Sequence, residues 1–152
     1  MTRAMPIRER LRDDNPRLLA LWERSVRATH DFLAEADIDA LRPQVRDVYL
    51  DAVEIWVFED ADGLAGFVGL ADAQVEMLFL EPQRRGQGIG TRLLDHARGL
   101  RGALTVDVNE HNPQAHGFYR RYGFVDIGRS PLDGQGRPFP LIHMALPRDA
   151  DA

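Results

Sequence analysis

Hydrophobic and polar positions along the chain follow two repeating patterns, one typical of strands and the other of helices. Apolar runs rich in β-branched and aromatic residues, bounded by turn residues, predict strands. These runs lie at residues 6–9, 53–58, 64–70, 75–80, 104–109, 124–129 and 139–146. Glycine and aspartate at 60–63 and at 133–136 predict that two pairs of these strands form hairpins.

Four segments between the strands have the apolar spacing of helices. The first begins at Asn15 and ends before Thr29, and the second covers about 38–50, where Pro43 is expected to break or restart it. The third follows Gly88, and the fourth begins after Asn112 and stops at Gly123. The expected buried stripes are Leu18, Leu19, Trp22 and Val26 in the first helix, and Ile89, Leu93, Leu94, Ala97 and Leu100 in the third.

The order of these elements predicts one α/β (α+β) domain over residues 1–147, followed by a disordered tail at 148–152. A length of 152 residues is enough for one domain with its own hydrophobic core. No repeat and no low-complexity linker divides the chain. We therefore expect a single folded unit.

Composition excludes several classes of function. The net charge of −5 argues against nucleic acid or an anionic membrane as the main partner, because binding to such surfaces relies on an excess of basic residues. The chain has no cysteine, which excludes disulfides, a cysteine nucleophile and a thiolate metal site. The first residues lack the apolar segment of a signal peptide, and no apolar run is long enough to span a bilayer. A cytoplasmic protein without a metal site is the resulting prediction.

The segment 78–90 is the most informative motif in the sequence. An apolar run ends at Pro82 and gives way to two arginines and three alternating glycines, after which an amphipathic helix begins. Glycines let the backbone approach a ligand closely, and the start of a helix carries the positive end of its dipole. Walker A and dinucleotide-binding spacings are absent, so a nucleotide-binding domain is disfavoured. The motif predicts a pyrophosphate site, although an isolated glycine-rich turn could be only a tight strand-to-helix connection.

A second motif covers residues 112–124 and follows the predicted strand 104–109. Asn112 with a proline after it is a typical N-cap and first turn, and Gly123 is a typical helix stop. One face of this helix carries four residues at helical spacing, namely Ala115, Phe118, Tyr119 and Tyr122. Aromatic side chains in such a stripe are usually core residues, and this is the interpretation for Phe118 and for Phe124.

Together the two motifs resemble the signature of the GNAT N-acetyltransferase superfamily. The spacing Arg85-x-x-Gly88-x-Gly90 is similar to the loop with which that family holds the pyrophosphate of acetyl-CoA. The second motif of this chain also resembles that of the family, in the family's order and separation. It consists of Asn112, Ala115, the pair Phe118-Tyr119 and the pair Gly123-Phe124. Residues 24–26, 28–33, 108–110, 128–130 and 138–141 further resemble the small bacterial YjaB-type acetyltransferases. The resemblance implies the GNAT fold, with about six to seven strands in a mixed sheet and about four flanking helices.

The resemblance also implies which residues bind the cofactor. The pyrophosphate would be held by Arg84, Arg85, Gly86, Gln87, Gly88, Ile89, Gly90 and Thr91. Asn112 would orient the pantetheine arm. Backbone groups of Leu78, Phe79 and Leu80 would polarise the thioester carbonyl and pair with the pantetheine amides like an added strand.

The implied reaction is direct attack of an amine on the thioester within a ternary complex. By resemblance Tyr119 is the proton donor to the leaving thiolate, since a phenol is protonated at neutral pH. Glu76 is the preferred general base, because strand alternation puts it on the same side as Leu78. Asp107 falls where some ribosomal-protein acetyltransferases place a catalytic glutamate. Further alternatives for the base are Glu110, His111 and His30.

The sequence therefore predicts an acetyl-CoA-dependent N-acetyltransferase whose acceptor is a primary amine on a small molecule or peptide. An acidic run, Asp31, Glu35, Asp37 and Asp39, suggests a cationic acceptor, although such a run is usually a solvated face. A monomer or a homodimer is expected. The alternative from another class is a non-catalytic acetyl-CoA-binding sensor or interaction module. Tyr119 beside an intact glycine loop argues against that alternative.

Overall fold

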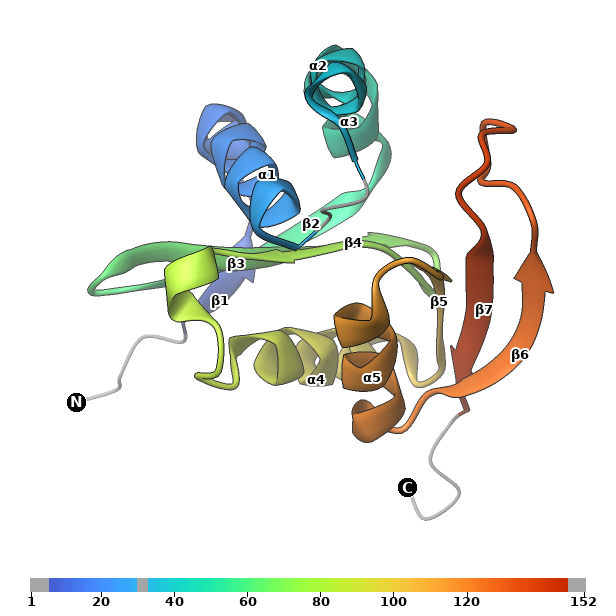
Figure 1. The fold of residues 1–152 in the computed structure, drawn as a ribbon. Coiled ribbons are helices and arrows are strands. Elements are labelled where there is room, and N and C mark those ends of the chain that lie inside the picture. The colour runs from blue at the N-terminus through green and yellow to red at the C-terminus, as the bar shows by residue number, and fades with distance from the viewer. Residues whose placement is uncertain (1–5, 30–32, 148–152) are drawn as a thin grey trace.

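The computed structural model describes residues 6–29 and 33–147. A single sheet with strand order β1-β2-β3-β4-β5-β7-β6 separates two layers of helices (Figure 1). Neighbouring strands are antiparallel except β4 and β5, which are parallel. The strands are β1 (Ile7–Glu9), β2 (Glu54–Asp60), β3 (Gly63–Ala71), β4 (Gln74–Leu80), β5 (Leu104–Asn109), β6 (Val125–Ser130) and β7 (Leu141–Leu146). The predicted mixed α/β fold is confirmed.

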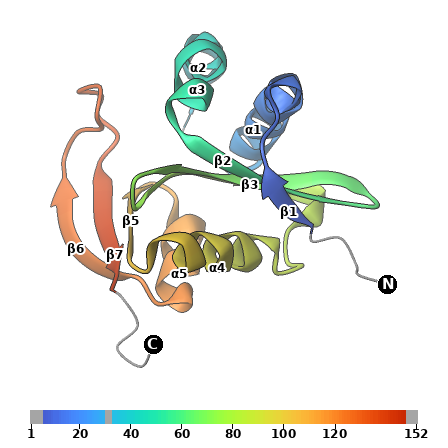
Figure 2. The same cartoon turned by 180° about the vertical axis from the view of Figure 1, so that it is seen from behind.

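The helices cover both faces of the sheet. On one face lie α1 (Asn15–Thr29), α2 (Glu35–Gln44) and α3 (Leu50–Ala52), and on the other lie α4 (Ile89–Arg101) and α5 (Pro113–Tyr122), as the two opposite views show (Figures 1 and 2). Short 3₁₀ turns at Arg12–Asp14 and Pro82–Arg84 precede α1 and follow β4. The parallel pair requires a crossover connection, and α4 supplies it.

The predicted break at Pro43 is wrong. Helix α2 runs through Pro43 and continues without interruption into a π-helical turn at Val45–Tyr49 and then into α3. Proline removes one N–H donor from the helical ladder, and widened turns are found where that ladder is disturbed. Val45 and Leu50 are buried, so packing against the sheet holds the segment helical despite the proline.

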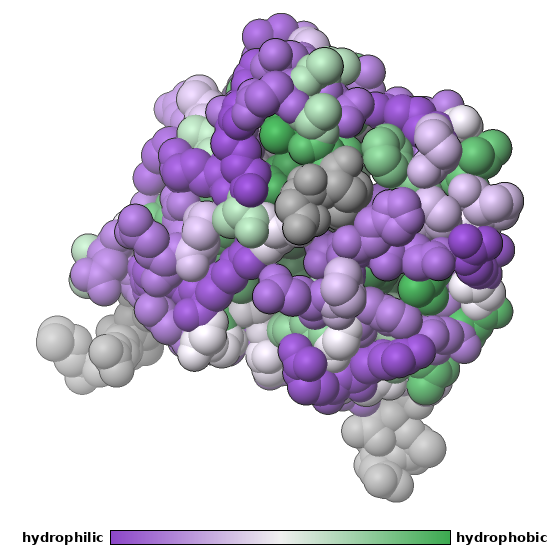
Figure 3. Space-filling model, in the orientation of Figure 1, coloured by the Kyte–Doolittle hydropathy of each residue, from purple (hydrophilic) through white to green (hydrophobic). Residues whose placement is uncertain are grey.

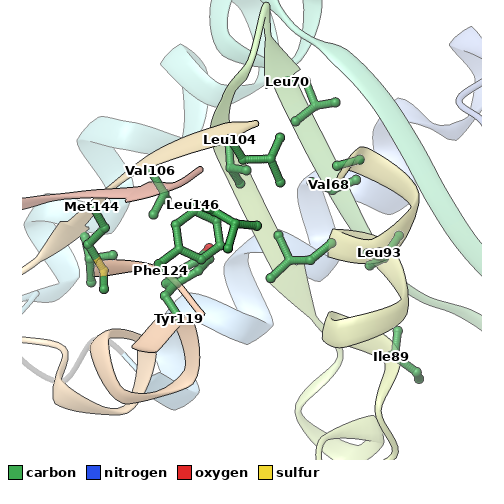
Figure 4. Packing of buried hydrophobic residues seen from close by; sticks show 14 of the residues in the cluster. Val68, Leu70, Ile89, Leu93, Leu104, Val106, Tyr119, Phe124, Met144 and Leu146 are labelled. Atoms are coloured by element: carbon green, nitrogen blue, oxygen red, sulfur yellow. The ribbon is translucent and has the colours of Figure 1, made fainter. Parts of the chain in front are cut away.

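Two hydrophobic cores lie on opposite faces of the sheet. The core under α4 and α5 includes Leu93, Phe124 and Met144 (Figure 4), and the core under α1 and α2 includes Trp22 and Phe67. The predicted stripe of α4 is buried except at Leu100, which is 42% exposed, so that assignment is corrected. Leu100 lies in the last turn of the helix, next to Arg101 and the C-capping Gly102, where the chain turns toward β5.

The feature that positions the site is an opening between β4 and β5. The two strands pair only at Gln74 with Thr105 and at Val75 with Val106. On its other side β4 has a bulge, since Gly69 faces Met77 whereas Leu70 faces Val75, which leaves Glu76 as the extra residue. Beyond Val75 the two strands separate. Within this sheet, the β5-facing backbone groups of residues 76–80 therefore have no strand partner.

The surface agrees with the acidic, polar composition. Hydrophilic residues cover most of the face seen in Figure 3, and hydrophobic groups are exposed there only in small patches. In the parts of the chain that the structure describes, no helix is long and apolar enough to cross a membrane.

Candidate functional site

A groove of about 700 Å³ lies where β4 and β5 separate. Its lining comes from the end of α1, from β4, from the loop before α4, from β5 and from α5. This volume is typical of sites for small molecules and cofactors. Both sequence motifs therefore contribute to the same groove.

The glycine loop has the backbone geometry of an anion site. Gly86 and Gly88 have φ angles of +77° and +80°, which residues with a Cβ rarely adopt, and Gly88 is the N-cap of α4. A Cβ at either position would meet nothing within 4 Å, so the backbone borders open space. The N–H groups of the first helical turn have no intrahelical acceptor. Together with the helix dipole they form a site suited to a phosphate.

The two arginines of the loop differ in their surroundings. Arg85 lines the groove, and its Nη2 lies 3.4 Å from Ser25 Oγ. Partial burial lowers the pKa of Arg85, and among the described residues no carboxylate pairs with it. It is therefore the arginine that is placed to meet a pyrophosphate.

Arg84, which was predicted to help hold the pyrophosphate, does not line the groove. Its guanidinium donates to both carboxylate oxygens of Asp60 in the β2–β3 hairpin, at 2.5 and 3.2 Å. The carboxamide of Gln87 accepts from Arg84 Nε at 2.9 Å and likewise lies outside the lining. These two side chains anchor the loop to the sheet, because Asp60 offers a closer partner for the cation than the groove does.

The predicted pantetheine contacts lie in the groove. Leu78, Phe79 and Leu80 line it from β4, on the edge that β5 leaves unpaired. Asn112 also lines it and is only 7% exposed. Its Oδ1 accepts from the Ala115 N–H at 3.2 Å, which confirms the predicted N-cap.

Tyr119 joins the core and the groove. Its ring contacts those of Phe118 and Phe124 edge-on, with centroid distances of 5.3 and 5.2 Å. Figure 4 shows Tyr119 beside Phe124. The residue is 7% exposed and lines the groove. Burial raises the pKa of the Tyr119 hydroxyl far above its ordinary value, because a phenolate would be poorly solvated there. The phenol therefore remains protonated over the whole physiological pH range.

Two carboxylates lie at the mouth of the opening. Glu76 and Asp107 follow directly after Val75 and Val106, the last paired residues of β4 and β5, and both line the groove. Glu76 is exposed at the surface of the groove, and partial desolvation there together with the nearby charge of Asp107 raises the pKa of Glu76. The bulge interrupts the strand alternation used to orient Glu76, and its side chain borders a second, smaller hollow under α1 and α2 as well as the groove.

The other candidate bases have different surroundings. Glu110 pairs with Arg129 at 2.6 Å, and neither Glu110 nor His111 lines the groove. His30 and Asp31 lie outside the described residues. The remaining acidic residues near α2 are engaged locally, since Glu35 pairs with Arg27, Asp39 pairs with Arg42, and Asp37 accepts from the Ala34 N–H.

Several groove residues were not identified from the sequence. These are Ser25 and Thr29 on α1, residues 106–109 apart from Asp107 on β5, and Gln114 and Arg121 on α5. Gln114 and Arg121 lie within the second motif, and Arg121 follows Gln114 and Phe118 at helical spacing, so this polar side of the helix carried a signal for both. Ser25 and Thr29 could not be assigned to the groove from the sequence, because only the packed fold shows which end of α1 lies beside it. Within the described ranges no cluster of three histidine or carboxylate side chains is arranged to hold a metal ion.

Comparison with known proteins gives one consistent family. The model of the acetyltransferase (GNAT) domain matches residues 51–126. The peptidyl-lysine N-acetyltransferase YjaB of Salmonella typhimurium is 43% identical over 93% of this chain and 97% of its own length. The solution structure of the apo form of YjaB from Escherichia coli superposes with a TM-score of 0.86, at 39% identity over 94% of this chain and 97% of that chain.

A more distant structure has the same fold. The PaiA N-acetyltransferase of Thermoplasma acidophilum, solved in complex with coenzyme A, covers 97% of this chain and 100% of its own, with a TM-score of 0.78 at 18% identity. At that identity the likeness concerns the fold alone.

Proposed function

The chain belongs to the GNAT acetyltransferases and is an acyl-CoA-dependent N-acetyltransferase, and from this premise we propose that it moves the acetyl group of acetyl-CoA to the side-chain amine of peptidyl lysine. The observation that carries the proposal is that the expected cofactor-binding and catalytic residues line one groove. The glycine loop, Tyr119 and Glu76 all line it. The YjaB relatives are peptidyl-lysine N-acetyltransferases, which supports the choice of acceptor.

We infer that the loop and the open edge of β4 bind acetyl-CoA. The N–H groups at the start of α4 and the cation of Arg85 bind the pyrophosphate, and Arg121 adds a second positive charge at the rim. The unpaired edge of residues 78–80 receives the pantetheine amides as a strand would. Asn112 Nδ2 donates to the same arm. Bound in this way, acetyl-CoA supplies a thioester carbonyl and a thiolate leaving group.

Two side chains move protons in this proposal. Glu76 takes a proton from the lysine ammonium, and its raised pKa makes it a stronger base than an ordinary carboxylate. Tyr119 delivers a proton to the departing sulfur. The two groups come from different elements, Glu76 from the β4 bulge and Tyr119 from α5, and both line the groove.

The pH profile of Glu76→Gln tests this assignment. We expect turnover on a lysine peptide to fall by about a hundredfold at neutral pH, with little change in acetyl-CoA affinity. The loss should shrink at high pH, where the free amine needs no base. In the parent protein turnover should rise as pH increases through the pKa of Glu76, which lies above the ordinary value for glutamate.

Asp107→Asn is the matched variant, since it removes the neighbouring carboxylate. Without the charge of Asp107, the pKa of Glu76 falls, so the acidic limb of the turnover profile should move to lower pH. A larger loss of turnover in Asp107→Asn than in Glu76→Gln would show instead that Asp107 is the base. Stopped assays of coenzyme A release across the pH range distinguish the two results.

A further inference from the structure

Three side chains beside the groove form a continuous hydrogen-bonded chain. His143 Nδ1 lies 2.6 Å from Asp107 Oδ1, and His143 Nε2 lies 2.7 Å from Ser130 Oγ. The three residues come from adjacent strands, β5, β7 and β6. His143 is directly opposite Asp107 in the register of β5 and β7. The catalytic groups assigned above do not include His143 or Ser130.

The chemistry of the partners determines the direction of the hydrogen bonds. An ionised carboxylate can only accept, so the Nδ1 position of His143 must carry a hydrogen and donate it to Asp107. When the ring is neutral, Nε2 is then the acceptor and the Ser130 hydroxyl donates to it. Ser130 thereby holds the ring in the tautomer that faces Asp107 with a donor.

Asp107 is consequently held on both of its oxygens. Oδ1 faces His143, and Oδ2 accepts from Gln74 Nε2 at 3.2 Å. Gln74 is in turn within 3.3 Å of the Thr105 hydroxyl. Donors from the strands on either side of β5 therefore orient one carboxylate at the point where β4 and β5 separate.

Asp107 differs from two other carboxylates in this region in having no arginine partner. Neighbouring carboxylates are neutralised by arginines, as in the pairs Glu110–Arg129 and Asp126–Arg120. Among the described residues Asp107 has neither an arginine nor a lysine partner, although it lines the groove. Glu76 adds a second acidic group on the facing strand. An ordered carboxylate with no arginine partner beside a substrate groove is a suitable binding site for a cationic ligand.

We propose that Asp107 binds the ammonium group of the acceptor lysine, and that His143 and Ser130 are positioning residues that hold this carboxylate in place. The inference depends on the proposed function, since it names the group that recognises the acceptor. It adds residues that act on the Michaelis constant for the acceptor, in contrast to Glu76 and Tyr119, which act on turnover.

Two substitutions at position 143 separate positioning from packing. In His143→Leu no donor reaches Asp107, whereas in His143→Asn the side-chain amide can donate from close to the former Nδ1 position. With acetyl-CoA saturating and a single-lysine peptide with a blocked N-terminus, His143→Leu should raise the KM for peptide roughly tenfold and change kcat by less than about threefold. His143→Asn should return the KM to within about threefold of the parent value.

A second histidine–aspartate pair within the described residues supplies the control. His116 Nε2 lies 2.8 Å from Asp126 Oδ1, outside the groove lining, so His116→Leu should leave the KM for peptide unchanged. An equal increase of KM in His143→Leu and His143→Asn would mean that the ring only packs, and an unchanged KM in His143→Leu would exclude any role. Either result would overturn the proposal.

An NMR measurement tests the proposed binding of the lysine ammonium by Asp107 even if the protein acetylates no peptide. Nitrogen-15 NMR of the histidine ring should show a hydrogen on Nδ1 of His143, and addition of the lysine peptide should shift this signal in the parent but not in Asp107→Asn. Absence of transfer with this shift present would reject the proposed function and retain the binding site. A His143 signal that does not respond to the peptide would reject the binding site itself.

Discussion

Replacing Tyr119 with phenylalanine is expected to lower turnover by about a hundredfold to ten-thousandfold while acetyl-CoA affinity stays nearly unchanged. The substitution keeps the ring that contacts Phe118 and Phe124, so folding should be preserved. It removes only the hydroxyl, which burial keeps protonated and therefore available to the leaving thiolate. Initial rates of coenzyme A release, together with calorimetric titration of acetyl-CoA, measure the two effects separately.

Tyr122→Phe is the matched control for this experiment. The Tyr122 hydroxyl donates to Asp95 at 2.6 Å and does not line the groove, so its loss should cost about 1 kcal/mol of stability and leave turnover within about twofold of the parent. A Tyr119→Phe protein that is folded, binds acetyl-CoA and turns over at the parental rate would show that Tyr119 is a core aromatic only.

Substitution of Gly88 by valine should abolish detectable acetyl-CoA binding. Gly88 has a φ of +80°, which a β-branched residue rarely adopts, and its position borders the open space in front of the first turn of α4. Valine would both strain the loop and place methyl groups where the pyrophosphate is expected. Calorimetric titration of the folded variant against acetyl-CoA measures this loss.

Gly136→Val supplies the control for backbone strain. Gly136 has a φ of +75°, also has nothing within 4 Å of an added Cβ, and lies in the β6–β7 loop outside the groove lining. Its substitution strains a turn to a similar degree, so a comparable loss of stability with normal acetyl-CoA affinity is expected. Unchanged affinity in a folded Gly88→Val protein would remove the glycine loop from the binding site.

Much of this architecture could be predicted from local sequence signals. Strand and helix periods indicated the order of the elements, and the caps at Asn112 and Gly123 marked the ends of α5 correctly. Local features indicated the glycine loop and the helix starts, and the resemblance to the GNAT family implied that both motifs serve one cofactor site. Both motifs line the same groove. The family assignment made from these motifs is confirmed by the comparisons.

Features that depend on tertiary pairing could not be predicted in this way. The β4 bulge at Glu76 and the separation of β4 from β5 arise from how three strands align, which no single segment encodes. Arg84 carries the same charge as Arg85, and only the position of Asp60 distinguishes their roles. His143 lies far from Asp107 in sequence and meets it only through the register of β5 and β7.

Leu100 illustrates the limit of periodicity within a helix. Its spacing fits the apolar stripe of α4, but the stripe continues only as far as a partner surface exists. Sequence spacing gives the face of a helix, and the extent of burial along that face depends on the elements that pack against it.

The central claim, direct transfer from acetyl-CoA to lysine in the β4–β5 groove, is tested most directly by a single-turnover experiment. Protein loaded with acetyl-labelled acetyl-CoA is mixed with a peptide that contains one lysine and a blocked N-terminus, and the mixture is quenched at successive times. The account predicts that label appears on the lysine Nε at the rate of coenzyme A release, with none attached to the protein. Tight binding of acetyl-CoA without transfer, or release of coenzyme A without labelled peptide, would contradict it.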